Sequence, residues 1–136
     1  MGGRMRNVQV DVGNPTAVAS TITASLQQDP TIDAVLTLQG AVAVQAVQAA
    51  REAHSDATIA TFDLSTDVLK AILAGQISFA IDQQPFVQGY LGVTTLYLHA
   101  LNGNDVGGGQ PVYSGPAFVT KDNAQQVLTY AERGTR

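Results

Sequence analysis

Short apolar stretches alternate with helical patterns along most of the chain, and this alternation constrains the fold more than any other feature. Residues Asp33–Leu38 form a nearly continuous apolar run, which is typical of a parallel-sheet strand covered on both faces. Thr58–Phe62 and Ser78–Ile81 have the length and composition of two further strands. Val8–Val12 alternates apolar and polar residues with period two, which predicts a strand covered mainly on one face.

A helical pattern follows each of these predicted strands. The expected helices run from Pro15 to about Gln28, from Ala41 to Ala53, from a Ser65 or Thr66 cap to the region of Gly75, and from Pro85 to Leu101. Pro15 and Pro85 suit the first helical position, because the backbone N–H there has no partner within the helix. The repeated strand–helix order with short connections predicts an α/β fold. We expect a three-layer sandwich with a mostly parallel sheet and helices on both faces.

The C-terminal part of the chain has a different character. Asn102–Gly109 is rich in Gly and Asn, which indicates a flexible turn. Ala117–Thr120 predicts a short extended piece, and a last short helix is expected after Lys121, followed by a frayed end. At the other terminus, residues 1–7 predict an irregular start.

Composition narrows the function classes. The 136 residues are 45% hydrophobic, enough for one domain with a core. Seven Lys and Arg against eleven Asp and Glu give a net charge of −4, which argues against nucleic acid or an anionic membrane as a partner. The absence of Cys excludes disulfides and zinc–thiolate sites. No apolar run reaches the length of about 18 residues that spans a bilayer, and no signal peptide is visible.

Polar residues recur just after the predicted strands. They are Asn14, Gln39, Asp63 and Gln83. Ligands of open α/β sheets bind at the carboxyl ends of the strands, so four polar side chains at this level suggest a binding site. The alternative is that they are ordinary cap and loop residues. That alternative explains Asn14 well and Asp63 less well, because Ser65 or Thr66 already offers a cap.

The segment Asp82-Gln83-Gln84 suggests the chemistry of the ligand. Its side chains offer both hydrogen-bond donors and acceptors, which suits a neutral polyhydroxylated molecule better than an ion. Asp63 and Asp82 could approach each other at the sheet edge, and a carboxylate pair can do acid–base work. Because no nucleophile, base or metal partner accompanies them, we expect no catalytic residues, no metal site and no cofactor.

Four segments together resemble a known family. They are Asp33-Ala-Val-Leu-Thr-Leu-Gln-Gly, Ala60-Thr-Phe-Asp-Leu-Ser, Phe79-Ala-Ile-Asp-Gln-Gln-Pro and Gly115-Pro-Ala-Phe-Val-Thr-Lys-Asp-Asn. They are similar to the type I periplasmic sugar-binding proteins of ABC transporters, the ribose-binding-protein-like group. The resemblance extends from about Val8 to Asn123.

The resemblance implies an incomplete two-lobed protein. Such proteins have two α/β lobes joined by a three-strand hinge, and the sugar is held between them. Residues 8–84 resemble part of the C-terminal sugar-binding lobe, and residues 85–136 resemble the hinge-crossing helix and the closing segment. By this resemblance, the N-terminal lobe and the first strand and helix of the second lobe are expected to be absent from the chain. That strand belongs between Val8–Val12 and Asp33–Leu38, so these two must pair directly, leave a gap, or recruit another strand such as Ala117–Thr120.

The resemblance also implies site residues and partners. Gln39 corresponds to an amide that bonds sugar hydroxyls, Asp63 to the carboxylate of a Phe-Asp motif, and Gln83 to the hinge-proximal glutamine. The implied partners are a small-molecule sugar, the missing N-terminal lobe and the permease of an ABC transporter. The implied location is the periplasm or, lipid-anchored, the cell exterior. The alternative is a stand-alone half-domain with a structural or self-association role and no sugar affinity. In either case, helix Pro85–Leu101 must fold back onto the sheet or mediate self-association.

Overall fold

A four-stranded mixed sheet forms the centre of the computed structural model, which describes residues 3–136. Its strands are β1 (Ala34–Thr37), β2 (Thr58–Phe62), β3 (Phe79–Asp82) and β4 (Ala117–Val119), in the spatial order β1-β2-β3-β4. The first three strands are parallel, and β4 pairs antiparallel with β3, with Ile81 opposite Phe118.

Five α-helices accompany the sheet within these residues. They are α1 (Pro15–Gln28), α2 (Gly40–Glu52), α3 (Thr66–Leu73), α4 (Pro85–Asn102) and α5 (Ala124–Ala131), with a short 3₁₀ turn, η1, at Gly107–Gly109. Two of the predicted caps are present. The side chain of Asn14 accepts a hydrogen bond from the Ala17 N–H at 3.1 Å, and that of Ser65 accepts one from the Val68 N–H at 3.2 Å.

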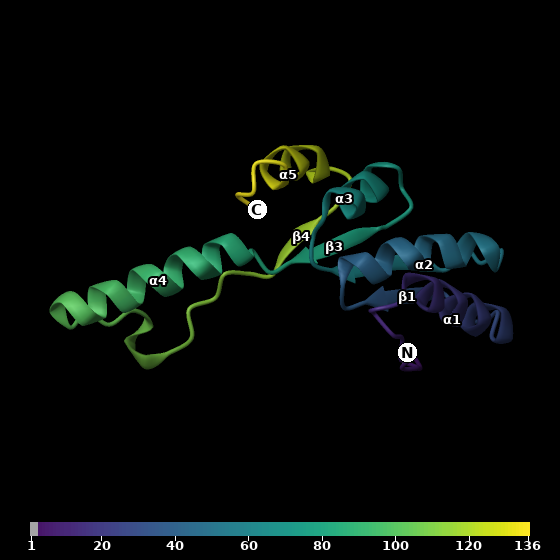
Figure 1. Cartoon of the computed structure of the whole chain (residues 1–136), viewed down its shortest axis with the longest axis horizontal. Coiled ribbons are helices and arrows are strands. Elements are labelled where there is room, and N and C mark those ends of the chain that lie inside the picture. The colour runs from purple at the N-terminus through teal and green to yellow at the C-terminus, as the bar shows by residue number, and fades with distance from the viewer. Residues whose placement is uncertain (1–2) are drawn as a thin grey trace.

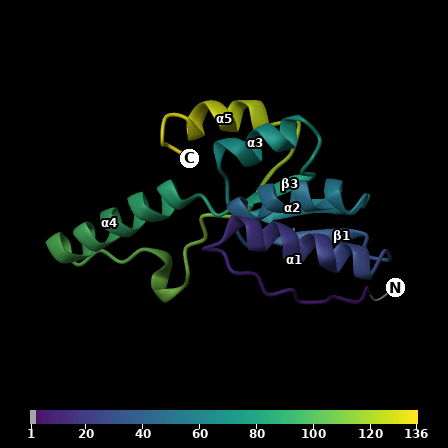
Figure 2. The ribbon, with the colours of Figure 1, turned by 45° about the vertical axis from the view of Figure 1, so that its right-hand side comes forward.

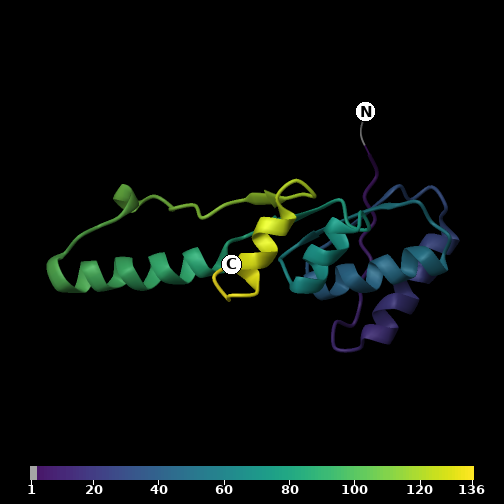
Figure 3. The same ribbon diagram turned by 90° about the horizontal axis from the view of Figure 1, so that it is seen from above.

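Helices α1, α2, α3 and α5 lie side by side in a row on one face of the sheet (Figures 2 and 3). The direction of the connections explains this. The chain steps from β1 to β2 to β3 always toward the same edge, and right-handed crossovers that advance in one direction place their helices on the same side. The predicted α/β class with a mostly parallel sheet is therefore confirmed. The predicted helix layer on the second face is not found within residues 3–136.

The core lies between the sheet and this row of helices. Its fully buried side chains include Val18, Val68, Leu69, Ile72, Ile77 and Val119. Burial of each large apolar side chain stabilises the fold by about 1.5–3 kcal/mol relative to its exposure. The opposite face is far less covered: Leu36 is 55% exposed and Phe118 is 56% exposed.

The prediction of a strand at Val8–Val12 is wrong in this structure. The segment keeps the predicted alternation, since Val8 and Val10 are half-buried, but it pairs with no described strand. A strand requires a neighbour that satisfies its backbone N–H and C=O groups. The nearest strand in the chain, β1, pairs only with β2 among the described strands. Of the three outcomes expected for this edge, the structure shows the gap, and Ala117–Val119 pairs at the opposite edge instead.

Helix α4 projects away from the sheet and its helices, and the following segment returns alongside it (Figure 1). No residue of α4 is buried. We call residues 85–116 the arm. The expectation that this helix folds back onto the sheet is thus not met. Within residues 3–136, no helix is both long and apolar enough to cross a membrane.

The predicted fraying of the C-terminal end is also wrong. After α5 the chain turns back at Gly134, which has a φ of 68°. The N–H of Thr135 donates to the carbonyl of Tyr130 at 3.1 Å. These contacts hold the residues after α5 against the helix.

The contrast between the buried row of helices and the arm is testable. We expect Leu69→Ala in α3 to lower the free energy of unfolding by about 2–5 kcal/mol, because it leaves a cavity in the core. Leu96→Ala in α4 is the matched control; its side chain is 72% exposed, and its effect should stay within about 0.5 kcal/mol. Urea unfolding followed by circular dichroism measures both. Equal losses would contradict the exposed position of α4.

Candidate functional site

The three predicted site residues follow three adjacent parallel strands. Gln39 precedes α2 two residues after β1, Asp63 directly follows β2, and Gln83 directly follows β3. Since the strands are neighbours and parallel, these residues lie along one edge of the sheet. The structure therefore places all three at the carboxyl ends of the strands.

Asp63 and Gln83 are in direct contact. The Nε2 of Gln83 donates to Oδ1 of Asp63 at 2.6 Å. The backbone of Asp63 has a φ of 67°, in the left-handed region that Asp tolerates better than most residues. Its N–H donates to the carbonyl of Ile81 at 3.0 Å, which fixes the turn after β2 against β3. A charged acceptor is thereby held beside an amide.

Gln39 lies on the neighbouring turn. Its backbone is extended, and its side chain makes no capping hydrogen bond to α2, so the amide is free to meet a ligand. Gly40 brings the two turns together. A Cβ at Gly40 would lie 3.1 Å from Cγ2 of Val68 and 3.5 Å from the carbonyl oxygen of Asp63. A residue without a side chain lets the start of α2 approach the Asp63 turn closely.

Two buried threonines at the ends of β1 and β2 support the turns that carry Gln39 and Asp63. Thr37 Oγ1 donates to Thr61 Oγ1 at 2.6 Å, and Thr61 Oγ1 in turn lies 2.8 Å from the carbonyl of Phe62. Thr37 Oγ1 is also 3.3 Å from the carbonyl of Gln39. The hydroxyl pair thus joins the ends of β1 and β2 immediately before Gln39 and Asp63.

The remaining polar residues have other roles. Asn14 caps α1, which agrees with the alternative that it is an ordinary cap residue. The suggested pairing of Asp63 with Asp82 is wrong. Asp82 is 1% exposed, and its oxygens accept from the N–H of Gln84 at 2.8 Å and from Nε of Arg136 at 2.7 Å. Successive strand residues face opposite sides of a sheet, so Asp82 is directed toward the helices and away from Gln83. No pattern in the sequence singled out Arg136.

Two cavities within residues 3–136, of about 240 Å³ and about 490 Å³, are lined by other residues. The first lies between the start of α4 and the end of α5, and the second lies at the loops that precede β1 and β2. The described residues contain no group of three or more His, Asp or Glu that could hold a metal ion. What the site offers is one carboxylate and two amides, a set that can accept from and donate to hydroxyl groups.

The sequence and the fold are similar to those of known proteins. The sequence model of a protein family, the periplasmic binding protein domain, matches residues 5–105. The chain is 49% identical to a carbohydrate transporter from Acidothermus cellulolyticus 11B, solved in complex with myo-inositol. That match has a TM-score of 0.87 and covers 93% of this chain and 44% of the other. AraP, an arabinose binding protein from Geobacillus stearothermophilus, shares the fold at 21% identity and a TM-score of 0.70, over 84% of this chain and 42% of its own.

A further similarity is to the xylose/arabinose-binding protein XylF of Sulfolobus acidocaldarius. The two are 33% identical over 69 residues, which are 49% of this chain and 16% of that protein. The chain thus spans less than half the length of each of the relatives it matches here.

The threonine pair allows a test of how the site is supported. Thr37→Val and Thr61→Val should each lower the free energy of unfolding by about 1–3 kcal/mol, because each leaves a buried hydroxyl with a lost partner. The double variant should cost less than the sum, since both hydroxyls are then gone. Thermal and urea unfolding of the unmodified chain, the two single variants and the double variant completes a double-mutant cycle for the two hydroxyls. Additive losses would show that the two hydroxyls do not interact.

Proposed function

The chain belongs to the periplasmic binding protein domain family, and from this premise we propose that it is the greater part of the C-terminal lobe of a sugar-binding component of an ABC transporter. The observation that carries the proposal is the position of Gln39, Asp63 and Gln83 along one carboxyl edge, with Asp63 and Gln83 in contact. The 49% identical relative solved with myo-inositol supports a polyhydroxylated ligand.

The chemistry of the three side chains suits such a ligand. A carboxylate accepts hydrogen bonds from sugar hydroxyls, and bonds to a charged acceptor are stronger than neutral ones. Each amide can donate to one hydroxyl oxygen and accept from another hydroxyl. Asp63 already accepts from Gln83, so a hydroxyl can join or replace that bond within a preformed network. No catalytic step is part of this proposal.

The proposal extends to the domains and partners. Residues 8–84 form the partial sugar-binding lobe, and residues 85–136 form the hinge-crossing helix and the closing segment, whose β4 and α5 pack on that lobe. The N-terminal lobe supplies the other wall of the cleft, and the complete protein delivers its sugar to a membrane permease. Its location is the periplasm or, held by a lipid anchor, the cell exterior. The missing lobe covers the apolar side chains of α4, among them Val93, Leu96 and Tyr97.

Half a cleft should bind weakly. We expect the 136-residue chain to bind myo-inositol, xylose or arabinose with a dissociation constant of about 1 mM or higher, which is about 4 kcal/mol or less. The reason is that one side of the sugar stays hydrated and only part of its hydrogen bonds form. Titration followed by amide NMR is the measurement, and the side-chain signals of Gln39 and Gln83 should shift.

Matched variants show where the sugar binds. Asp63→Asn and Gln83→Ala should abolish the shifts, whereas Gln28→Ala, an exposed glutamine of α1 outside the site, should leave them unchanged. Shifts confined to the cavity near Asp33 and His54 would refute the proposed site. So would a dissociation constant unaffected by both site variants.

A second candidate role is self-association without sugar affinity, and the exposed α4 is the observation that favours it. Its large side chains Tyr90, Val93, Leu96 and Tyr97 are between 63% and 72% exposed. Exposed apolar groups gathered on one helix mark an interface or an aggregation site. For the chain by itself, a second copy is then the available partner.

Sedimentation velocity tests this role. At micromolar concentration the chain should sediment as a dimer or larger species, because the apolar side chains of α4 are otherwise left in water. Leu96→Glu should return it to a monomer, while Gln28→Glu on α1 should not. A clean monomer that binds no apolar dye would exclude α4 as an association surface.

A further inference from the structure

Asp82, at the end of β3, is a buried carboxylate with two partners. Oδ1 accepts from the N–H of Gln84 at 2.8 Å, and Oδ2 accepts from Nε of Arg136 at 2.7 Å. The side chain of Arg136 is 29% exposed, that of Asp82 only 2%. A buried charge is unfavourable unless it is paired and hydrogen-bonded. Arg136 therefore supplies the cationic partner of this buried side chain.

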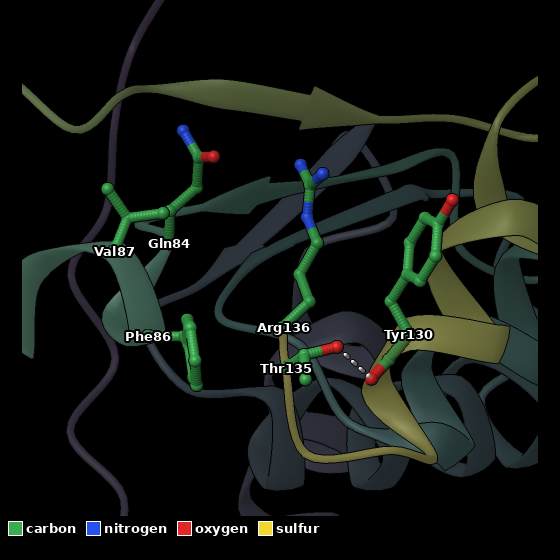
Figure 4. A pocket seen from close by; sticks show the side chains of 6 residues that line it. All are labelled: Gln84, Phe86, Val87, Tyr130, Thr135 and Arg136. Atoms are coloured by element: carbon green, nitrogen blue, oxygen red, sulfur yellow. Dashed lines mark hydrogen bonds between the residues drawn. The ribbon is translucent and has the colours of Figure 1, made fainter. Parts of the chain in front are cut away.

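The chain after α5 delivers Arg136 to this place. Besides the Thr135 N–H bond, Oγ1 of Thr135 donates to the carbonyl of Tyr130 at 3.2 Å, and the N–H of Gly134 donates to that of Ala131 at 3.0 Å. Figure 4 shows Arg136 between the start of α4, marked by Gln84 and Phe86, and Tyr130 of α5. The cavity of about 240 Å³ lies between these two elements, and Arg136, which lines it, donates a hydrogen bond to Asp82 at the end of β3.

Asp82 is also next to the place where the chain leaves β3 for the arm, at Gln84, and returns from it, at Ser114. Gln84 has a left-handed backbone with a φ of 56°, and its side chain donates to the carbonyl of Ser114. The carbonyl of Gln83 accepts from Oγ of Ser114 at 3.1 Å and from Nε2 of Gln88 at 2.7 Å. The peptide group between Gln83 and Gln84 is thus held at its carbonyl by Ser114 and Gln88 and at its N–H by Asp82.

This bend aims the Gln83 side chain. Asp82 and Gln83 face opposite sides of the sheet, so the bond of Asp82 to the Gln84 N–H fixes the backbone while the Gln83 amide reaches Asp63 at 2.6 Å on the other side. If the carboxylate of Asp82 loses Arg136, it must seek water or another donor. Its bond to the Gln84 N–H then weakens, and only the contacts of Ser114 and Gln88 with the Gln83 carbonyl still hold the bend.

We propose that Arg136, acting through Asp82, is a positioning residue for the sugar site. This inference rests on the function proposed above and assigns a role in it to a residue on the opposite face of the sheet. Arg136 touches no sugar in this scheme. Its effect passes through Asp82 and the Gln84 N–H to the orientation of the Gln83 amide.

The test starts without ligand. Arg136→Gln removes the charge, and Arg133→Gln, an exposed arginine three residues earlier, is the matched control. In amide NMR spectra of the 136-residue chain, Arg136→Gln should shift the Gln83 side-chain signals and speed their hydrogen exchange. Arg133→Gln should leave them unchanged. Arg136→Lys should restore them in part, because it keeps the charge but not the planar guanidinium.

Titration with myo-inositol gives the second readout. Arg136→Gln should raise the dissociation constant about tenfold, a loss of about 1.4 kcal/mol. If Arg136→Gln fails to fold, the double variant Asp82→Asn with Arg136→Gln removes both charges and should fold with shifted Gln83 signals.

The outcomes separate the two claims. Unchanged Gln83 signals in every folded variant overturn the positioning role, even where stability falls. A dissociation constant equal to that of the unmodified chain also overturns it. If Arg136→Gln moves the Gln83 signals but neither the unmodified chain nor any variant binds myo-inositol, the positioning of Gln83 stands and the proposed function fails.

Discussion

The right-handed crossover is the constraint on which the rest of this structure depends. Because β1, β2 and β3 follow one another toward the same edge, α2 and α3 must lie on one face, and α1 and α5 extend that row. Parallel strands also have their carboxyl ends at the same end of the sheet, so the turns with Gln39, Asp63 and Gln83 are neighbours. The same geometry explains the buried helix side of the sheet, the more exposed opposite face and the line of polar groups.

The three turns of the site are supported by different means, all from the side of the sheet that the helices cover. Under the first two turns, the hydroxyls of Thr37 and Thr61 join the strand ends, and Gly40 allows close packing of α2. Under the third turn, the support is ionic and comes from Asp82 and Arg136. The difference follows from position. The first two turns lead into helices packed on the sheet, whereas the third leads into the arm, whose helix α4 has no buried residue.

Much of the fold could be predicted because its determinants are local. The spacing of Val18, Ile22 and Leu26 predicts the buried side of α1, and Asn14 predicts its start. The predictions that the structure contradicts concern features that depend on distant residues. Val8–Val12 has the pattern of a strand, but a strand also needs a hydrogen-bonding neighbour, which its own residues do not reveal. The candidate site residues can be proposed from the sequence because each follows a strand within two residues. Asp82 was misread because β3 includes it, one residue beyond the predicted strand end, and Arg136 reaches it over 54 positions.

The pairing of the outgoing and returning chain at Gln84 and Ser114 has a mechanical consequence. Two adjacent strands can bend together about an axis that runs along the hydrogen bonds between them, because such a motion leaves those bonds at constant length. Rotation within the plane of the two strands would instead require one to slide past the other, and would break the contacts among Gln83, Gln84 and Ser114. Bending across the two connecting segments is therefore the displacement of the arm that these contacts oppose least.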